Sequence, residues 1–260
     1  MSRNATYFIS DLHLGARFME GSHYYERRVV AWLESIRPDC KRLYLVGDVL
    51  DYWYEYRYVV PKGHVRFFGK LAQMADDGVE ITWLAGNHDV WLFGYFEKEL
   101  GIKLHDGPIV TDIDGARFYI DHGDGTGKVK PAMRFIRALF RNRLAQLLYG
   151  AVHPRWTVPL ATGLSFGSRN NHKREAERLK ERLAARIGEH KQKLIDFADA
   201  YRDPSGRPID YFIFGHLHAL TLEPLPNAPG RFALLGDWIG LCSYARYADG
   251  KMEIGRFNYS

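Results

Sequence analysis

Five apolar segments, each followed directly by a polar motif, constrain this chain more than any other feature of its sequence. The segments are short and rich in aromatic and β-branched residues, so each motif is expected where a β-strand ends and a loop begins. Five strand ends would then deliver side chains to one pocket. The motifs are Asp11-Leu12-His13, Gly47-Asp48, Gly86-Asn87-His88-Asp89, His122-Gly123-Asp124 and Gly215-His216-Leu217-His218.

The donor atoms in these motifs are carboxylate oxygens, imidazole nitrogens and one amide oxygen, with no thiolate among them. This set suits divalent ions such as Mn²⁺, Fe²⁺ or Zn²⁺ rather than a structural zinc site built from cysteines. Two such ions can lower the pKa of a shared water and hold phosphoryl oxygens during in-line attack. The sequence therefore predicts a two-metal hydrolase that acts on an anionic phosphoester or diphosphate.

Each motif also has a plainer interpretation when it is taken singly. An aspartate at a loop, such as Asp48, is often only a turn former. An isolated histidine, such as His88, is usually structural or solvated. Its position beside Asn87, a proposed ligand, favours instead a role on the substrate side of the site.

Spacing within two motifs predicts how their side chains point. In an extended chain, residues i and i+2 point to the same side. Asp11 and His13 are therefore expected to reach one ion together. By the same reasoning, the imidazoles of His216 and His218 are expected to point the same way.

Length and composition indicate one catalytic domain. At 260 residues and 46% hydrophobic, the chain can bury one large core, or one core with an appended cap. Its two cysteines, Cys40 and Cys242, cannot build a disulfide framework, which favours a reducing cytoplasm. The first motif begins at residue 11 and no run of about 18 apolar residues occurs, so we expect neither a signal peptide nor a membrane-spanning segment.

The segment 127–193 differs in charge from the rest of the chain. It holds 16 Lys and Arg against 4 Asp and Glu, a net charge of +12. Since the whole chain has a net charge of +5, the rest of the chain has a net charge of −7. We interpret 1–126 and 194–260 as the catalytic core and 127–193 as a basic helical cap inserted close to the site. The alternative is a solvated helical pair that merely packs on the core.

Two cap helices are expected, the first starting at Pro131 and the second running from Asn171 to about Tyr201. The first is amphipathic, a pattern typical of helices at a membrane interface. Its apolar residues are Met133, Ile136, Phe140, Leu144 and Leu147, and arginines recur on another face at Arg134, Arg137 and Arg141.

The remaining pattern predicts a mixed α/β chain. Helices are expected over 22–36 and 64–76, where apolar residues share one face. A hairpin over 108–120 is expected to turn at Asp114-Gly115. Further strands are expected at 5–10, 41–46, 79–84, 209–214, 220–225, 231–235, 240–247 and 251–257.

Taken in order, the five motifs resemble those of the calcineurin-like metallophosphoesterases, and they span residues 11–218. The resemblance implies an α/β fold, a four-layer αββα sandwich with two stacked sheets and a dinuclear centre at their edge. It implies that one metal is held by Asp11, His13, Asp48 and His218. Asp48 would bridge the two ions, and the second would be completed by Asn87, His122 and His216.

Within that superfamily the chain looks most like the UDP-2,3-diacylglucosamine hydrolases, which act in lipid A synthesis and cleave a diphosphate to UMP and an acylated sugar 1-phosphate. The best-known branch has arginine in place of His88, and an acidic residue after H-G-D where this chain has Lys128 and Lys130. The residues that carry the resemblance are Ile9-Ser10-Asp11-Leu12-His13-Leu14-Gly15, Gly47-Asp48-x-x-Asp51-x-Trp53 and the basic insertion after H-G-D.

The resemblance also implies partners and roles. The cofactors would be two divalent ions, Mn²⁺ before Fe²⁺ or Zn²⁺, and the substrate an acylated nucleotide sugar. The protein would attach peripherally to the cytoplasmic face of the inner membrane, while its oligomeric state stays open. Catalysis would depend on His88 and Asp48. The expected substrate contacts are Asn87, His88, Asn170, Lys173 and His216.

Two other functions fit parts of the pattern. A nuclease or cyclic-nucleotide phosphodiesterase could use the same centre, with the basic cap holding a nucleic-acid backbone. A phosphate track does not require the many large apolar residues of the cap, so nucleic acid is not the expected partner. A scaffold of the same fold that has lost its chemistry is disfavoured because all seven proposed ligands are present.

Overall fold

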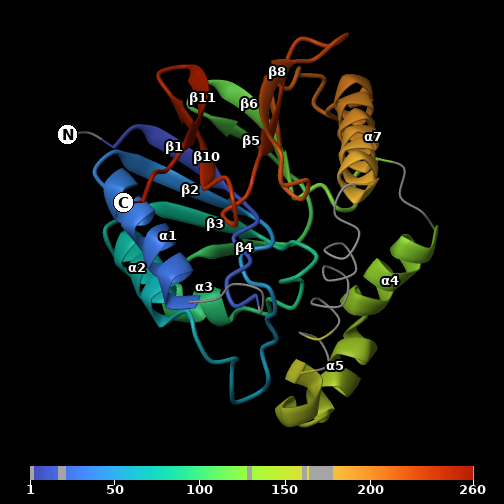
Figure 1. Cartoon of the computed structure of the whole chain (residues 1–260). Helices are drawn as coiled ribbons and strands as arrows, with labels where there is room; N and C mark the ends of the chain where they lie inside the picture. Colours follow the sequence, from blue (N-terminus) through green and yellow to red (C-terminus); the bar gives the residue numbers. More distant parts are fainter. Residues whose placement is uncertain (1–2, 17–21, 128–130, 160–162, 164–177, 260) are drawn as a thin grey trace.

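Two β-sheets are stacked face to face, with helices on both outer faces, in the computed structural model of the chain (Figure 1). The structure describes residues 3–16, 22–127, 131–159, 163 and 178–259. The expected four-layer αββα sandwich is confirmed by this arrangement.

The six-stranded sheet contains the first three motif-bearing strands side by side. Its four strands β1 to β4 run parallel, and the last two strands of the chain pair antiparallel beside β1. Strand β4 is one that the sequence pattern did not predict. In spatial order the strands are β11 (Lys251–Arg256), β10 (Ser243–Ala248), β1 (Ala5–Ile9), β2 (Cys40–Val46), β3 (Glu80–Leu84) and β4 (Lys103–His105).

The five-stranded sheet carries the other two motifs. Its three central strands run parallel and its two edge strands run antiparallel to their neighbours. The hairpin predicted around Asp114-Gly115 joins the first two strands. In spatial order the strands are β5 (Ile109–Ile113), β6 (Ala116–Asp121), β7 (Tyr211–Phe214), β9 (Arg231–Leu235) and β8 (Leu220–Pro224).

Three helices cover the six-stranded sheet: α1 (Ser22–Ile36), α2 (Val65–Asp76) and α3 (Tyr95–Leu100). Helix α7 (Arg178–Ala200) covers the five-stranded sheet, and α4 (Pro131–Arg141) and α5 (Arg143–Ala151) lie beside the sandwich (Figure 1). The residues 171–177, where a helix was expected to begin, lie outside the described residues. Among the described helices, none is both long enough and apolar enough to cross a bilayer.

The motif-bearing strands are uninterrupted runs of apolar residues because both faces of each sheet are covered, one by helices and the other by the second sheet. On β1, Tyr7 and Ile9 face α1 and α2, whereas Phe8 faces the other sheet. Phe8 stacks on Tyr44 of β2 and on Phe118 of β6, with ring centroids 5.2 and 5.7 Å apart. The two sheets are therefore fixed against each other by large side chains that alternate along each strand.

The first cap helix differs from its prediction. The apolar repeat suggested one helix from Pro131 through Leu147, but α4 ends at Arg141 and a second helix, α5, begins at Arg143. Asn142 lies between them in an extended conformation, and its side-chain oxygen accepts a hydrogen bond from the backbone N–H of Ala145. Asparagine is a favoured N-cap because it satisfies a free backbone donor of the first turn, so the helix restarts there.

Candidate metal centre

Five of the seven proposed metal ligands have a backbone conformation that non-glycine residues rarely adopt. Asp11, His13, Asp48, His216 and His218 have φ values of 55°, 46°, 52°, 66° and 51°. Such left-handed residues persist only where their surroundings fix them, and they gather at functional sites. Asp11 and His13 do belong to one ligand group, as expected, but left-handed rather than extended backbone places them there. The strands end before both motifs, and the loops supply the geometry.

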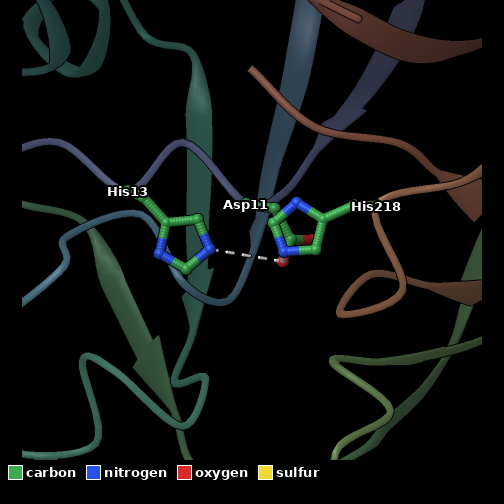
Figure 2. Close-up of side chains that lie close together, drawn as sticks. All are labelled: Asp11, His13 and His218. Carbon is green, nitrogen blue, oxygen red and sulfur yellow. Dashed lines mark ion pairs between the residues drawn. The ribbon is translucent and has the colours of Figure 1, made fainter. Parts of the chain in front are cut away.

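The first ligand group consists of Asp11, His13 and His218, whose nearest donor atoms all lie within 4.8 Å of one another. Asp11 Oδ1 is 3.7 Å from His13 Nε2 and 3.6 Å from His218 Nε2. Figure 2 shows the imidazole of His13 facing this carboxylate, with the ring of His218 overlapping the carboxylate in this view. Two loops from different sheets thus meet at one oxygen atom.

The second ligand group consists of Asp48, His122 and His216. Asp48 Oδ2 lies 3.4 Å from His122 Nε2, and Asn87 Oδ1 lies 3.3 Å from the same nitrogen. Asp48 Oδ2 is also 3.7 Å from His13 Nε2, so this oxygen stands between the two groups.

His216 and His218 contribute to different ligand groups. The expectation that their imidazoles point the same way is therefore wrong. Because both residues are left-handed rather than extended, their side chains diverge toward the two groups.

The donor atoms suit divalent cations. Asp11 and Asp48 are 0% and 2% exposed, and Asp11 Oδ1 has no hydrogen-bond partner within the described part of the chain. Separations of 3.4–3.7 Å are long for hydrogen bonds. They match two donors on a shared ion, since each donor lies about 2.0–2.2 Å from a metal such as zinc. A buried carboxylate oxygen facing imidazole nitrogens at this spacing therefore fits a metal site.

The charges within the site favour a cation as well. Burial opposes charge on His13, but the carboxylates of Asp11 and Asp51 outweigh it and raise the imidazole pKa to about 9. Burial likewise opposes charge on Asp11, yet the neighbouring imidazoles of His13, His122 and His218 lower its pKa to about 2. Burial and the neighbouring His122 lower the pKa of His216 to about 4. A bound metal would replace the protons on the charged imidazoles, since a coordinating imidazole is neutral.

Neighbouring acceptors turn the Nε2 atoms of two ligands toward the centre. His122 Nδ1 donates to the backbone carbonyl of Val46 at 2.9 Å. His218 Nδ1 lies 3.2 Å from Asp237 Oδ2. A nitrogen that donates on one side of an imidazole leaves the other free for a metal. The sequence analysis missed Asp237, although Gly236-Asp237 follows a strand as Gly47-Asp48 does.

Two glycines are needed because ligands pack directly against them. Gly47 has a φ of 78°, and a Cβ atom there would collide with the ring of His122. A Cβ atom on Gly86 would collide with the carboxylate of Asp48. Each motif glycine therefore clears space for a ligand of another motif.

His88 lies beside the centre, between ligands and solvent. Its backbone N–H donates to Asp48 Oδ1 at 2.8 Å, and its ring meets the ring of His13 edge-on at 4.8 Å. His88 Nδ1 donates to the backbone carbonyl of Asp51 at 3.1 Å, because a carbonyl can only accept. The side chain is 19% exposed, so the ring is held in place yet still reaches solvent.

The cap helices are attached to the loops of the centre. Arg137 forms an ion pair with Asp124 of the fourth motif, and the indole N–H of Trp91 donates to the carbonyl of Phe140 at 2.8 Å. Arg141 pairs with Asp106 at 2.8 Å. Two of the three arginines predicted on a separate face of this helix thus bind carboxylates of the core. Asn170 and Lys173, the expected cap contacts to substrate, lie outside the described residues.

Large apolar side chains of the cap are exposed beside this attachment. Phe135 and Leu147 are 69% and 71% exposed. Leu147 also lines a cavity of about 680 Å³, together with Tyr54, Tyr56 and Phe93 among others. The further exposed apolar residues of this part of the chain are Ile136, Leu139, Phe140, Leu144, Leu148, Val152 and Trp156.

Comparison with known proteins agrees with the motifs. The sequence model of the calcineurin-like phosphoesterase family matches residues 6–220. A UDP-2,3-diacylglucosamine hydrolase from Porphyromonas gingivalis is 45% identical, over 94% of each chain. Another from Ralstonia nicotianae is 28% identical, over 89% of this chain and 83% of that protein. The chain therefore belongs to the calcineurin-like phosphoesterase family, a family of hydrolases whose divalent metals suit the Asp and His groups described above.

Proposed function

We propose that the protein hydrolyses the diphosphate bond of UDP-2,3-diacylglucosamine and releases UMP and 2,3-diacylglucosamine 1-phosphate, a step of lipid A synthesis. The observation that carries this proposal is the 45% identity, along nearly the whole length of both chains, to a relative named for that reaction. The two ligand groups joined at Asp48 support it, since a paired-metal centre is suited to phosphoryl chemistry.

In this proposal seven residues hold two divalent ions. Asp11, His13, Asp48 and His218 hold one ion, and Asp48, Asn87, His122 and His216 hold the other. The chemistry that such ions supply is activation of water and neutralisation of phosphoryl oxygens. The two aspartates contribute a charge of −2 and the two ions a charge of +4. This surplus of positive charge favours a diphosphate over a neutral ester. We propose Mn²⁺ as the resident ion, with Fe²⁺ and Zn²⁺ suited to the same donors.

His88 is the proposed catalytic side chain on the substrate side. Its Nδ1 is committed to the carbonyl of Asp51, so Nε2 is the nitrogen available to the substrate. Protonated at both nitrogens, His88 would stabilise the attacked phosphoryl group or donate a proton to the leaving oxygen. A positioned general acid contributes about 10²–10⁴ in rate. Asn87 and His216 would contact the same phosphoryl group, and Asn170 and Lys173 the remainder of the substrate.

The cap is the proposed route for the acyl chains. Apolar residues are exposed on both α4 and α5, and Leu147 of α5 lines a cavity that is partly aromatic; acyl chains need such apolar surface. We propose that this surface also attaches the protein peripherally to the cytoplasmic face of the inner membrane, where an acylated substrate is found.

Activity profiling of Mn-loaded protein tests the proposed reaction. The substrates are UDP-2,3-diacylglucosamine, an unacylated UDP-sugar and single-stranded and duplex DNA. We expect UMP release from the acylated substrate alone, and near-total loss with Asp48→Ala because its oxygen joins both ligand groups. Equal cleavage of the unacylated sugar, or cleavage of DNA with salt-sensitive retention, would replace the proposal with another phosphoesterase activity.

A further inference from the structure

The connection between β9 and β10, residues 236–242, crosses from the five-stranded sheet to the six-stranded sheet beside the first ligand group. It follows all five motifs, and no residue of it was among the predicted ligands. Two of its residues nevertheless contact ligands of that group. Asp237 contacts His218 through its side chain, and Trp238 contacts Asp11 through its backbone.

The carboxylate of Asp237 is held on both oxygens. Oδ1 accepts hydrogen bonds from the backbone N–H groups of Gly240 and Leu241, at 2.8 and 3.0 Å. Oδ2 lies 3.2 Å from His218 Nδ1, and the side chain is only 11% exposed. A buried carboxylate fixed by two amides can hold an imidazole in one orientation and one tautomer.

That orientation places the opposite nitrogen in the ligand group. With Nδ1 toward Asp237, His218 Nε2 lies 3.6 Å from Asp11 Oδ1. The backbone N–H of Trp238 donates to the carbonyl oxygen of Asp11 at 3.1 Å. One short connection therefore positions two ligands that lie far apart in the sequence.

Within the described part of the chain, other segments hold the second ligand group. His122 is oriented by the carbonyl of Val46 on β2, and Asp48 accepts the N–H of His88. The direct contacts of the 236–242 connection with proposed ligands thus fall on the first group.

We propose that Asp237 is a positioning residue that selectively sets the affinity of the metal site formed around Asp11, His13 and His218. The inference rests on the proposed function, since it takes these three residues to be metal ligands. Loss of an imidazole's orienting partner weakens metal binding by about 10–100-fold. The effect falls on one ion of the pair.

The test measures Mn²⁺ binding and electron paramagnetic resonance in the full-length protein. In Asp237→Ala, one of two dissociation constants should rise by about 10–100-fold while the other stays within about 3-fold. At limiting Mn²⁺ the unaltered protein should give the electron paramagnetic resonance spectrum of two coupled Mn²⁺ ions. Asp237→Ala should give the hyperfine-split signal of a single isolated Mn²⁺ ion. Asp237→Asn, which keeps an oxygen acceptor and the volume, should fold like the unaltered protein and show a smaller rise.

Ser243→Ala is the matched control. Ser243 is fully buried at the end of the same connection, and its hydroxyl donates to the carbonyl of Leu235 at 2.7 Å. Its substitution should leave both dissociation constants unchanged. Equal weakening by Ser243→Ala and Asp237→Ala, or equal weakening of both ions, would overturn the inference. If the unaltered protein itself binds fewer than two ions, the proposed two-metal function is wrong. If it binds two ions and Asp237→Ala does not weaken one selectively, only the inference about Asp237 is wrong.

Discussion

Asp89 shows that a motif residue can serve the site without binding a metal. Its carboxylate is fully buried and ties the loop after β2 to the loop after β3. The sequence places Asp89 in the third motif but predicts no role for it. The groups that donate to it are the backbone N–H groups of Asp48, Val49, Leu50 and Gly86 and the indole N–H of Trp83.

Asp89→Ala should therefore lower the free energy of unfolding of the protein. Each buried donor left without an acceptor costs about 1–3 kcal/mol, so we expect a loss of about 3 kcal/mol or more in urea denaturation. Asp112→Ala is the control, because that carboxylate pairs with Arg117 and Arg207 at the exposed surface. Equal denaturation midpoints for the two variants would show that the loops do not depend on Asp89.

At the level of elements, α4 and α5 lie beside the sandwich, and ion pairs tie α4 to the core. Arg137 and Arg141 bind core carboxylates, whereas Phe135 and Leu139 on α4 are exposed. An apolar surface of this kind suits an acyl chain or a bilayer. Because both arginines are paired with carboxylates, the proposed membrane attachment would depend on apolar contact more than on their charge.

Replacing Phe135 and Leu139 together with serine tests that surface. We expect turnover of the diacylated substrate and binding to anionic vesicles to fall several-fold. Turnover of a small chromogenic phosphodiester and the melting temperature should change little, because both side chains are already exposed.

Val65→Ser is the control for that experiment, since Val65 is also an exposed apolar residue, at 75%, but lies at the start of α2, away from α4 and α5 in the sequence. It should leave vesicle binding and both activities unchanged. Equal losses on both substrates with the cap variant, or no loss on either, would contradict an acyl-binding cap.

At the scale of the whole molecule, the centre joins the two sheets. Asp11 and His13 follow β1 of the six-stranded sheet, whereas His218 follows β7 of the five-stranded sheet. The second group likewise combines Asp48 with His122 and His216. Ions that bind such groups bind only the folded state, so they should stabilise the entire sandwich.

Metal removal should therefore lower the melting temperature, and the loss should depend on pH. In the metal-free protein the pKa of His13 is raised from 6.5 to about 9. Its charge contributes stability that is fully present below pH 6.5 and is lost as pH rises through about 9. A metal competes with this proton, so metal stabilisation grows over the same window.

The measurement compares melting temperatures of Mn-loaded and chelator-stripped protein under argon, at about pH 6 and about pH 8.5. The difference between loaded and stripped protein should be larger at the higher pH. A difference independent of pH would mean that no imidazole of the centre exchanges a proton for the metal.

The sequence by itself determined the family, the sandwich and the set of proposed ligands. These follow from short strings of residues, because an apolar run that ends in a polar motif is a local feature and its strand-forming tendency is local too. The hairpin at Asp114-Gly115 and helix α1 were predictable for the same reason, since turn and amphipathic patterns lie within a few residues.

Only the tertiary structure decided how the ligands are divided and held. His216 donates its backbone N–H to Asp11 Oδ2, from 205 residues further along the chain, and left-handed backbone at both histidine positions sends their rings to different groups. The roles of Asp89 and Asp237 likewise depend on strands packed against one another across two sheets. Such contacts arise when distant segments are buried together, and no local pattern encodes which acceptor a buried N–H group will meet.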